Sequence, residues 1–210
     1  MRPGEPKARK NGYKKPMARG LTAALVTLVE DCTLPFAARF RWPQVPATHL
    51  DRKTGLPFFS YFDDLAQLMN GLDGLRDADI QLAFLDLARF RDFNNQFGQD
   101  MGDAVLEAFA STLRETLNAT VVRDGGDEML VLGAPTRSGL AQDLDQMRKE
   151  WPSRFRARFG ESAPPVAPRI VVTKAHGGDL RAMREQLGKS VGALKLRSKD
   201  VGPEGALAEV

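Results

Sequence analysis

The feature that most constrains the fold is a short polar break between two apolar runs near the middle of the chain. Val121 and Val122 precede the break, residues 129–132 follow it, and Arg-Asp-Gly-Gly-Asp-Glu lies between them. This pattern predicts two antiparallel strands joined by a tight turn, with the glycines supplying the positive φ angles that such turns need. Asp127 and Glu128 would then stand at the end of a sheet, where carboxylates can hold a divalent cation and a hydroxyl group. Taken alone, the tetrapeptide Gly-Gly-Asp-Glu at residues 125–128 is more typical of an ordinary structural turn.

The segments around this hairpin show alternating helical and extended character. Residues 80–86 form a short apolar run that ends in Asp86, which predicts a buried strand with an acid at its end. Residues 100–117 carry an apolar stripe at helical spacing, with Asp100 as the expected N-cap. The resulting order of elements indicates an α+β domain with one mostly antiparallel sheet covered by helices. Further helices are predicted over 57–71, 137–159 and 179–199, and a further strand over 169–174.

Charge and composition divide the chain into four segments. The net charge of +3 is concentrated at the N-terminus, so the rest of the chain is mildly acidic and gives no support for nucleic-acid binding by the folded part. The basic tail is interpreted as a solvated leader, and contact with an anionic membrane or nucleic acid is the alternative. The segments are a basic, disordered tail (1–19), a helical leader with a proline-rich linker (20–48), one domain (49–200) and a C-terminal tail (201–210).

Cysteine usage and hydropathy bear on the compartment. Cys32 is the only cysteine, so the chain cannot form an intramolecular disulfide. The apolar run over residues 21–29 is too short to span a bilayer, and no small-residue cleavage pattern follows it. We therefore expect a cytoplasmic protein.

Three motifs occur in a distinctive order along the domain over residues 49–200. Residues 51–57 read Asp-Arg-Lys-Thr-Gly-Leu-Pro, residues 86–98 read Asp-Leu-Ala-Arg-Phe-Arg-Asp-Phe-Asn-Asn-Gln-Phe-Gly and continue to Gly102 and Asp103, and residues 123–128 read Arg-Asp-Gly-Gly-Asp-Glu. In this order and spacing they resemble the GGDEF family of diguanylate cyclases over residues 49–200. The resemblance implies a palm-like nucleotidyl cyclase fold, with a central, mostly antiparallel sheet flanked by helices. It also implies that two GTP condense into cyclic di-GMP with release of pyrophosphate, and that catalysis needs a homodimer, because the family places one GTP in each of two facing domains.

The same resemblance assigns roles to individual residues. Asp86 and Asp127 would bind Mg²⁺ or Mn²⁺ through their side chains, with the carbonyl of Leu87 as a third ligand, and Glu128 would complete the catalytic acids beside the substrate. Guanine presents O6 as an acceptor and N1–H and N2–H as donors, which an amide and an acid can read together. The implied substrate-binding residues are Asn94 and Asp103 for the base, together with Phe90, Arg91, Gly125, Gly126 and Lys199.

Some positions depart from the family pattern and keep alternatives open. Ala88, Asn95 and Met129 differ from the usual residues without removing a metal ligand, whereas the basic motif near the C-terminus is altered, so that either Lys195 or Lys199 could hold the triphosphate. One alternative is a catalytically degenerate domain that binds GTP or a cyclic dinucleotide as a regulatory module. Another is an interaction module that works through the basic tail, and a third is a related polymerase with a different cyclic product.

Overall fold

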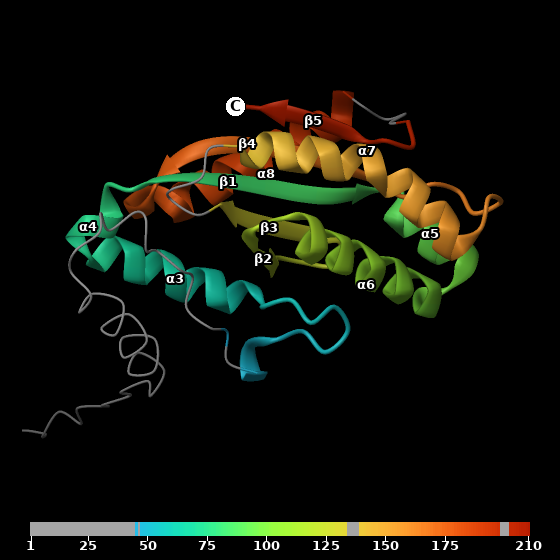
Figure 1. Ribbon diagram of the computed structural model, residues 1–210, viewed down its shortest axis with the longest axis horizontal. Helices are drawn as coiled ribbons and strands as arrows, with labels where there is room; N and C mark the ends of the chain where they lie inside the picture. Colours follow the sequence, from blue (N-terminus) through green and yellow to red (C-terminus); the bar gives the residue numbers. More distant parts are fainter. Residues whose placement is uncertain (1–44, 46, 134–138, 198–201) are drawn as a thin grey trace, which may run out of the picture.

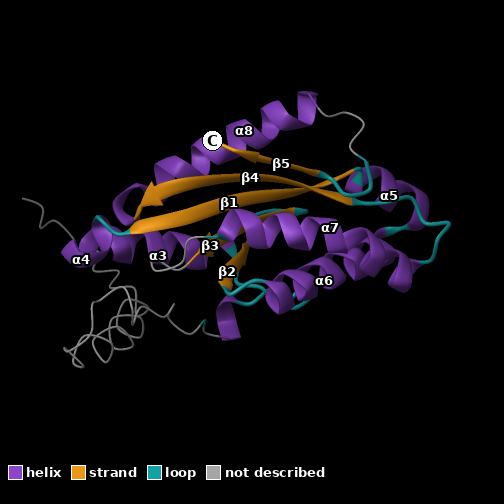
Figure 2. Ribbon diagram, turned by 45° about the horizontal axis from the view of Figure 1, so that its top comes forward, coloured by secondary structure: helices purple, strands orange, loops and turns teal. Residues whose placement is uncertain are grey.

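The computed structural model describes residues 45, 47–133, 139–197 and 202–210. In this part of the chain a five-stranded sheet lies between two groups of helices (Figures 1 and 2). The basic tail, nearly all of the helical leader, Cys32 and Lys199 lie outside the described residues. No helix in the described ranges combines the length and the hydropathy needed to cross a bilayer.

The sheet has the strand order β2-β3-β1-β4-β5. Its central strand, β1, pairs antiparallel with β3 on one side and with β4 on the other, and β2 completes an antiparallel hairpin with β3. The sheet is therefore mostly antiparallel, as predicted. The fifth strand, β5, runs parallel to β4 and was not predicted from the sequence. The strands are β1 (Asp79–Ala88), β2 (Ala119–Arg123), β3 (Glu128–Gly133), β4 (Ala167–His176) and β5 (Ala206–Glu209).

Side chains alternate between the two faces of the sheet, and each face is covered by its own helices. On β1, Ala83, Leu85 and Leu87 belong to the apolar cluster that contains α5, α6 and α7, whereas Leu82 and Phe84 belong to the cluster that contains α3 and α8. This period of two is what a strand buried on both faces requires. The helices are α3 (Phe59–Gly71), α4 (Asp73–Arg76), α5 (Phe90–Phe97), α6 (Gln99–Thr116), α7 (Leu140–Phe159) and α8 (Leu180–Arg197), with short 3₁₀ turns η1 (Ala47–His49) and η2 (Gly177–Asp179).

The start of α6 differs from the prediction. The N-cap is Gly98, with φ 85°, and Asp100 lies inside the first turn of the helix instead of capping it. A positive φ at Gly98 is what allows the chain to leave α5 and enter α6 without an intervening loop. The carboxylate of Asp100 still lies near the positive end of the helix dipole, so its expected stabilising effect on the helix is retained. Helix α5 itself was not predicted as a separate element.

Candidate functional site

The turn between β2 and β3 is closed by backbone hydrogen bonds. The amide nitrogens of Asp124 and Gly125 both donate to the carbonyl oxygen of Glu128, at 2.9 and 3.3 Å. Neither Gly125 nor Gly126 has a positive φ, so the conformational reason predicted for these glycines is wrong. A Cβ on Gly125 would lie 3.0 Å from Oε2 of Glu128, whereas a Cβ on Gly126 would meet no atom within 4 Å. Gly125 therefore leaves room for the Glu128 carboxylate, and Gly126 leaves an open approach to the turn.

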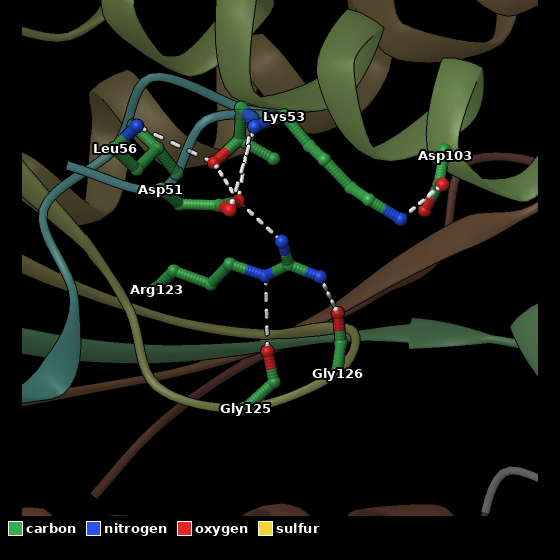
Figure 3. Close-up of polar contacts among 8 residues, drawn as sticks. Asp51, Lys53, Leu56, Asp103, Arg123, Gly125 and Gly126 are labelled. Carbon is green, nitrogen blue, oxygen red and sulfur yellow. Dashed lines mark hydrogen bonds and ion pairs between the residues drawn. The ribbon is translucent and has the colours of Figure 1, made fainter.

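Arg123, the last residue of β2, holds this turn from one side (Figure 3). Its Nε donates to the carbonyl oxygen of Gly125 at 3.1 Å, and its Nη2 donates to that of Gly126 at 2.9 Å. Its Nη1 forms an ion pair with Asp51, whose carboxylate also accepts a hydrogen bond from the Thr54 hydroxyl at 2.7 Å. The first and third sequence motifs are thus joined by one guanidinium group.

Three acidic residues lie near one another where β1 and β3 lie side by side. Asp86 is the register partner of Glu128, and Asp127 directly precedes Glu128 at the end of the turn. The Asp86 side chain is only 3% exposed, whereas that of Glu128 is 36% exposed. Burial, followed by the negative charge of Asp86, raises the pKa of Asp127 to about 6. Such a rise is expected where acidic groups lie close together and are partly buried.

Two cations already contact Asp86. Nζ of Lys195, on α8, lies 2.6 Å from Oδ1 of Asp86 and 3.5 Å from Oε1 of Glu128. Nη1 of Arg169, on β4, lies 3.1 Å from Oδ2 of Asp86, of which it is the register partner. Burial by itself would lower the pKa of Lys195, but Asp86 and the neighbouring acids outweigh it and raise the pKa. Nothing in the sequence indicated Arg169, because only the strand register reveals it, and the sequence left Lys195 and Lys199 as alternatives.

The oxygen atoms of these residues suit a hard divalent cation. Mg²⁺ and Mn²⁺ prefer carboxylate and carbonyl oxygens, which Asp86, Asp127 and the main chain of Leu87 supply. Among the described residues, however, no three His, Cys, Asp or Glu side chains are assembled as a ready-made ligand set. The chemical nature of these ligands therefore suits a divalent cation. The ammonium group of Lys195 lies beside the carboxylate oxygens of Asp86 and Glu128.

A second cluster lies where α5 meets α6. Oδ1 of Asn94 is buried and has no hydrogen-bond partner among the described residues. A Cβ on Gly102 would lie 1.7 Å from that oxygen, so only glycine leaves space for the Asn94 amide there. Asp103 follows Gly102, and its carboxylate is ion-paired with Lys53 from the loop that carries the first motif (Figure 3). An orphaned acceptor beside a second acceptor is a suitable receptor for a ligand with two N–H donors.

The remaining predicted residues occupy the start of α5. The Phe90 side chain is buried in the core, so any contact it makes with substrate falls to its backbone. Arg91 is exposed in the same helical turn. Arg89, just before them, has the left-handed φ of 62° and turns the chain from β1 directly into α5. The first amide groups of a helix have no intrahelical acceptor and favour anions, which makes this turn suited to a phosphate group.

Helix α8 is attached to the hairpin turn by a buried ion pair. Nη2 of Arg184 lies 2.6 Å from Oδ2 of Asp124, whose side chain is 1% exposed, and the guanidinium carbon lies 4.7 Å from the centre of the Phe59 ring on α3. Removing Arg184 would leave the Asp124 carboxylate buried without its partner, whereas the Arg184 side chain is 32% exposed. This pair fixes α8 against the turn, and the same helix carries Lys195 to the carboxylates.

Comparison with known proteins identifies the family. The family model described as "Diguanylate cyclase, GGDEF domain" matches residues 48–189. Diguanylate cyclase TpbB of Pseudomonas aeruginosa is 38% identical over 95 residues, which cover 43% of this chain and 21% of that protein. The chain thus matches about a fifth of the length of this curated relative.

Solved structures show the same fold. The GGDEF domain of DgcB from Caulobacter crescentus, in complex with c-di-GMP, superposes with a TM-score of 0.63 at 22% identity, over 79% of this chain and 98% of that one. The diguanylate cyclase SiaD of Pseudomonas aeruginosa, in complex with its activator SiaC, gives a TM-score of 0.60 at 26% identity, over 77% and 62% of the two chains. The GGDEF domain alone of TpbB gives 0.59 at 26% identity, over 77% and 95%. With the palm-like sheet, the acids where β1 pairs with β3 and a family match over residues 48–189, this chain belongs to the GGDEF-domain family of diguanylate cyclases.

Proposed function

We propose that this domain condenses two molecules of GTP into cyclic di-GMP and releases two pyrophosphates. The observation that carries the proposal is the proximity of Asp86, Asp127 and Glu128 where β1 pairs with the start of β3, with the cationic side chain of Lys195 beside Asp86 and Glu128. Carboxylates, a cation and an open turn in one place are what phosphoryl transfer from a nucleoside triphosphate requires.

The guanine base is assigned to the cluster between α5 and α6. The unpartnered Oδ1 of Asn94 and the carboxylate of Asp103 are acceptors for the N1–H and N2–H donors of guanine. The triphosphate would lie between the first turn of α5, where Arg91 is exposed, and Lys195 on α8. Gly125 and Gly126 would leave the space that the phosphates need beside the hairpin turn.

The reaction forms two phosphodiester bonds. In each half, the 3′-hydroxyl oxygen of one GTP bonds to the α-phosphorus of the other, the bond between that phosphorus and the α,β-bridging oxygen breaks, and pyrophosphate leaves. The proton of the hydroxyl is assigned to Glu128, whose half-exposed carboxylate stands opposite Asp86 in the sheet. A bound Mg²⁺ or Mn²⁺ would neutralise charge on the attacking and leaving oxygens. Asp86, Asp127 and the Leu87 carbonyl are the residues assigned to hold it.

One domain offers one base site, whereas the product contains two guanosines, so we propose that two copies of the chain face each other during catalysis. The proposed place of action is the cytoplasm, and a role of the basic N-terminal tail in contact with an anionic partner is kept as a separate proposal. The role of the tail can be tested by deleting residues 1–19, which leaves the site unaltered because these residues precede the domain that the family model matches.

The test is mass spectrometry of the product. The purified chain should convert GTP with Mg²⁺ or Mn²⁺ into a species with the mass of cyclic di-GMP, and it should give no mixed product when all four nucleoside triphosphates are present. A surface variant away from the site, Lys149→Met on the exposed face of α7, should form the same product at the same rate as the wild type.

Two other outcomes are informative. GTP binding by calorimetry without any product, at high protein concentration and with either metal, would contradict the cyclase and favour the regulatory module. A product of different mass would reassign the base specificity and leave the phosphoryl-transfer chemistry in place.

A further inference from the structure

The carboxylate of Asp86 is buried and both of its oxygens are engaged by cations. Oδ1 lies 2.6 Å from Nζ of Lys195, and Oδ2 lies 3.1 Å from Nη1 of Arg169. With an exposed fraction of only 3%, Asp86 has little access to water, so its charge has to be compensated by protein groups. The two cations provide that compensation.

The two cations differ in how easily they can leave. The Arg169 side chain is 10% exposed and stands on β4 directly opposite Asp86 in the register of the sheet, so the backbone fixes it there. The Lys195 side chain is 38% exposed and lies near the end of α8, which ends at Arg197. Lysine is a flexible chain with a point charge, and it can move without disturbing the backbone. Arg169 is therefore the fixed cation and Lys195 the exchangeable one.

The Lys195 ammonium lies beside a carboxylate oxygen of Asp86, which is one of the groups assigned to the divalent ion. It contacts one oxygen of Asp86 and, more distantly, one oxygen of Glu128, and it contributes to the charge environment of Asp127. A divalent ion bound to the same carboxylate oxygens would lie close to the ammonium group, and the two positive charges would repel each other. A triphosphate has acceptor oxygens to which the ammonium group can move, and its own charge attracts the metal.

We infer that Lys195 competes with the divalent cation for the Asp86 carboxylate in the nucleotide-free domain, while Arg169 fixes that carboxylate, so that metal binds tightly only when a nucleoside triphosphate draws Lys195 away. The inference rests on the proposed metal-dependent function. Arg169 is accordingly a positioning residue, and Lys195 links metal binding to nucleotide binding.

The test is a titration of the purified chain with Mn²⁺ in the absence of nucleotide. The electron paramagnetic resonance signal of the free ion measures how much Mn²⁺ is bound. Lys195→Met should bind Mn²⁺ at least about tenfold more tightly than the wild type, which corresponds to ~1.4 kcal/mol. Lys189→Met removes an exposed lysine from the same helix and should leave the Mn²⁺ affinity unchanged. Lys195→Gln is the second variant, with a polar side chain, should the methionine variant fold poorly.

A second measurement follows the exchange itself. In equilibrium dialysis with the non-hydrolysable analogue guanosine 5′-(α,β-methylene)triphosphate, the wild type should retain Mn²⁺ that it does not retain alone. Equal Mn²⁺ affinities of the wild type and both Lys195 variants would overturn the inference, as would absence of retention with the analogue. The arm without nucleotide involves no turnover, so its failure is distinct from the failure to make cyclic di-GMP.

Discussion

Arg123 on β2 pairs with Asp51 across 72 positions of sequence, and the same guanidinium group donates to the carbonyl oxygens of Gly125 and Gly126 (Figure 3). The Arg123 side chain is 15% exposed and that of Asp51 is 9% exposed, so the pair is largely removed from water. The shape of the turn that carries the acids therefore depends on a residue in the loop at the start of the domain.

Replacing Arg123 by lysine should destabilise the domain. Lysine keeps the charge but cannot hold Asp51 and two carbonyl oxygens at once, because it lacks the planar fork of arginine. We expect the free energy of unfolding, measured by urea titration, to fall by ~1–3 kcal/mol. The control is Arg154→Lys, whose ion pair with Glu115 is exposed and should contribute little. Equal effects of the two substitutions would contradict the assigned role of Arg123.

Stability at low pH should depend on Asp51. Burial by itself would raise the pKa of Asp51, but the hydrogen bond from Thr54 and the charge of Arg123 outweigh it and hold the pKa below its ordinary value of 3.8. As the pH falls, the unfolded chain takes up this proton first, so the stabilisation is fully present above the unfolded pKa and is lost as the pH falls through the folded pKa.

Asp51→Asn should therefore be less stable than the wild type near neutral pH, and the difference should shrink below about pH 4. The measurement is the free energy of unfolding of both proteins across this range. A difference that stays constant down to about pH 3 would show that the charge of Asp51 is not what stabilises the loop.

Substitution of Gly102 should impair guanine binding rather than folding. A Cβ at this position would lie 1.7 Å from Oδ1 of Asn94, so the amide has to turn away from its observed position. We expect Gly102→Ala to raise the Kd for GTP about tenfold, the order of one good hydrogen bond, in calorimetry. Gly188→Ala is the matched control, because its Cβ would meet no atom within 4 Å and alanine favours the helix. Unchanged GTP affinity in Gly102→Ala would remove Asn94 from the base site.

Replacing Lys53 by leucine should strengthen guanine binding. The ammonium group of Lys53 is paired with Asp103, so the N–H donors of guanine compete with it for the carboxylate. The pair is partly exposed, which limits the effect to about two- to fivefold in the Kd for GTP. Lys53→Arg keeps the charge and should bind GTP as the wild type does. Weaker GTP binding by the leucine variant would mean that Lys53 itself contacts the nucleotide.

The central strand and the hairpin could be predicted from the sequence because they depend on local patterns. The apolar run ending in Asp86 predicted the central strand, and the two runs around Gly125 predicted the hairpin, since period and turn residues are visible without any tertiary information. The family motifs then predicted which acids and amides share a site. The short strand β5 escaped because Ala206–Glu209 is too brief to show a period.

The cations of the site could not be predicted in the same way. Arg169 contacts Asp86 only because β1 and β4 are in that register, and Lys195 reaches it only because α8 packs along the turn held by Arg184. Both facts depend on how distant segments dock. The sequence pattern alone therefore left Lys195 and Lys199 as alternatives, and it gave no reason to consider Lys53 as a partner of Asp103.

The most direct test of the account is the initial rate of cyclic di-GMP formation from GTP in Asp127→Asn compared with the wild type. Asparagine keeps the size of the side chain and removes the charge that the proposed chemistry needs. The account predicts a loss of at least about a hundredfold, with the free energy of unfolding little changed or raised, because a partly buried charge is removed. Product formation at the wild-type rate by Asp127→Asn would contradict it.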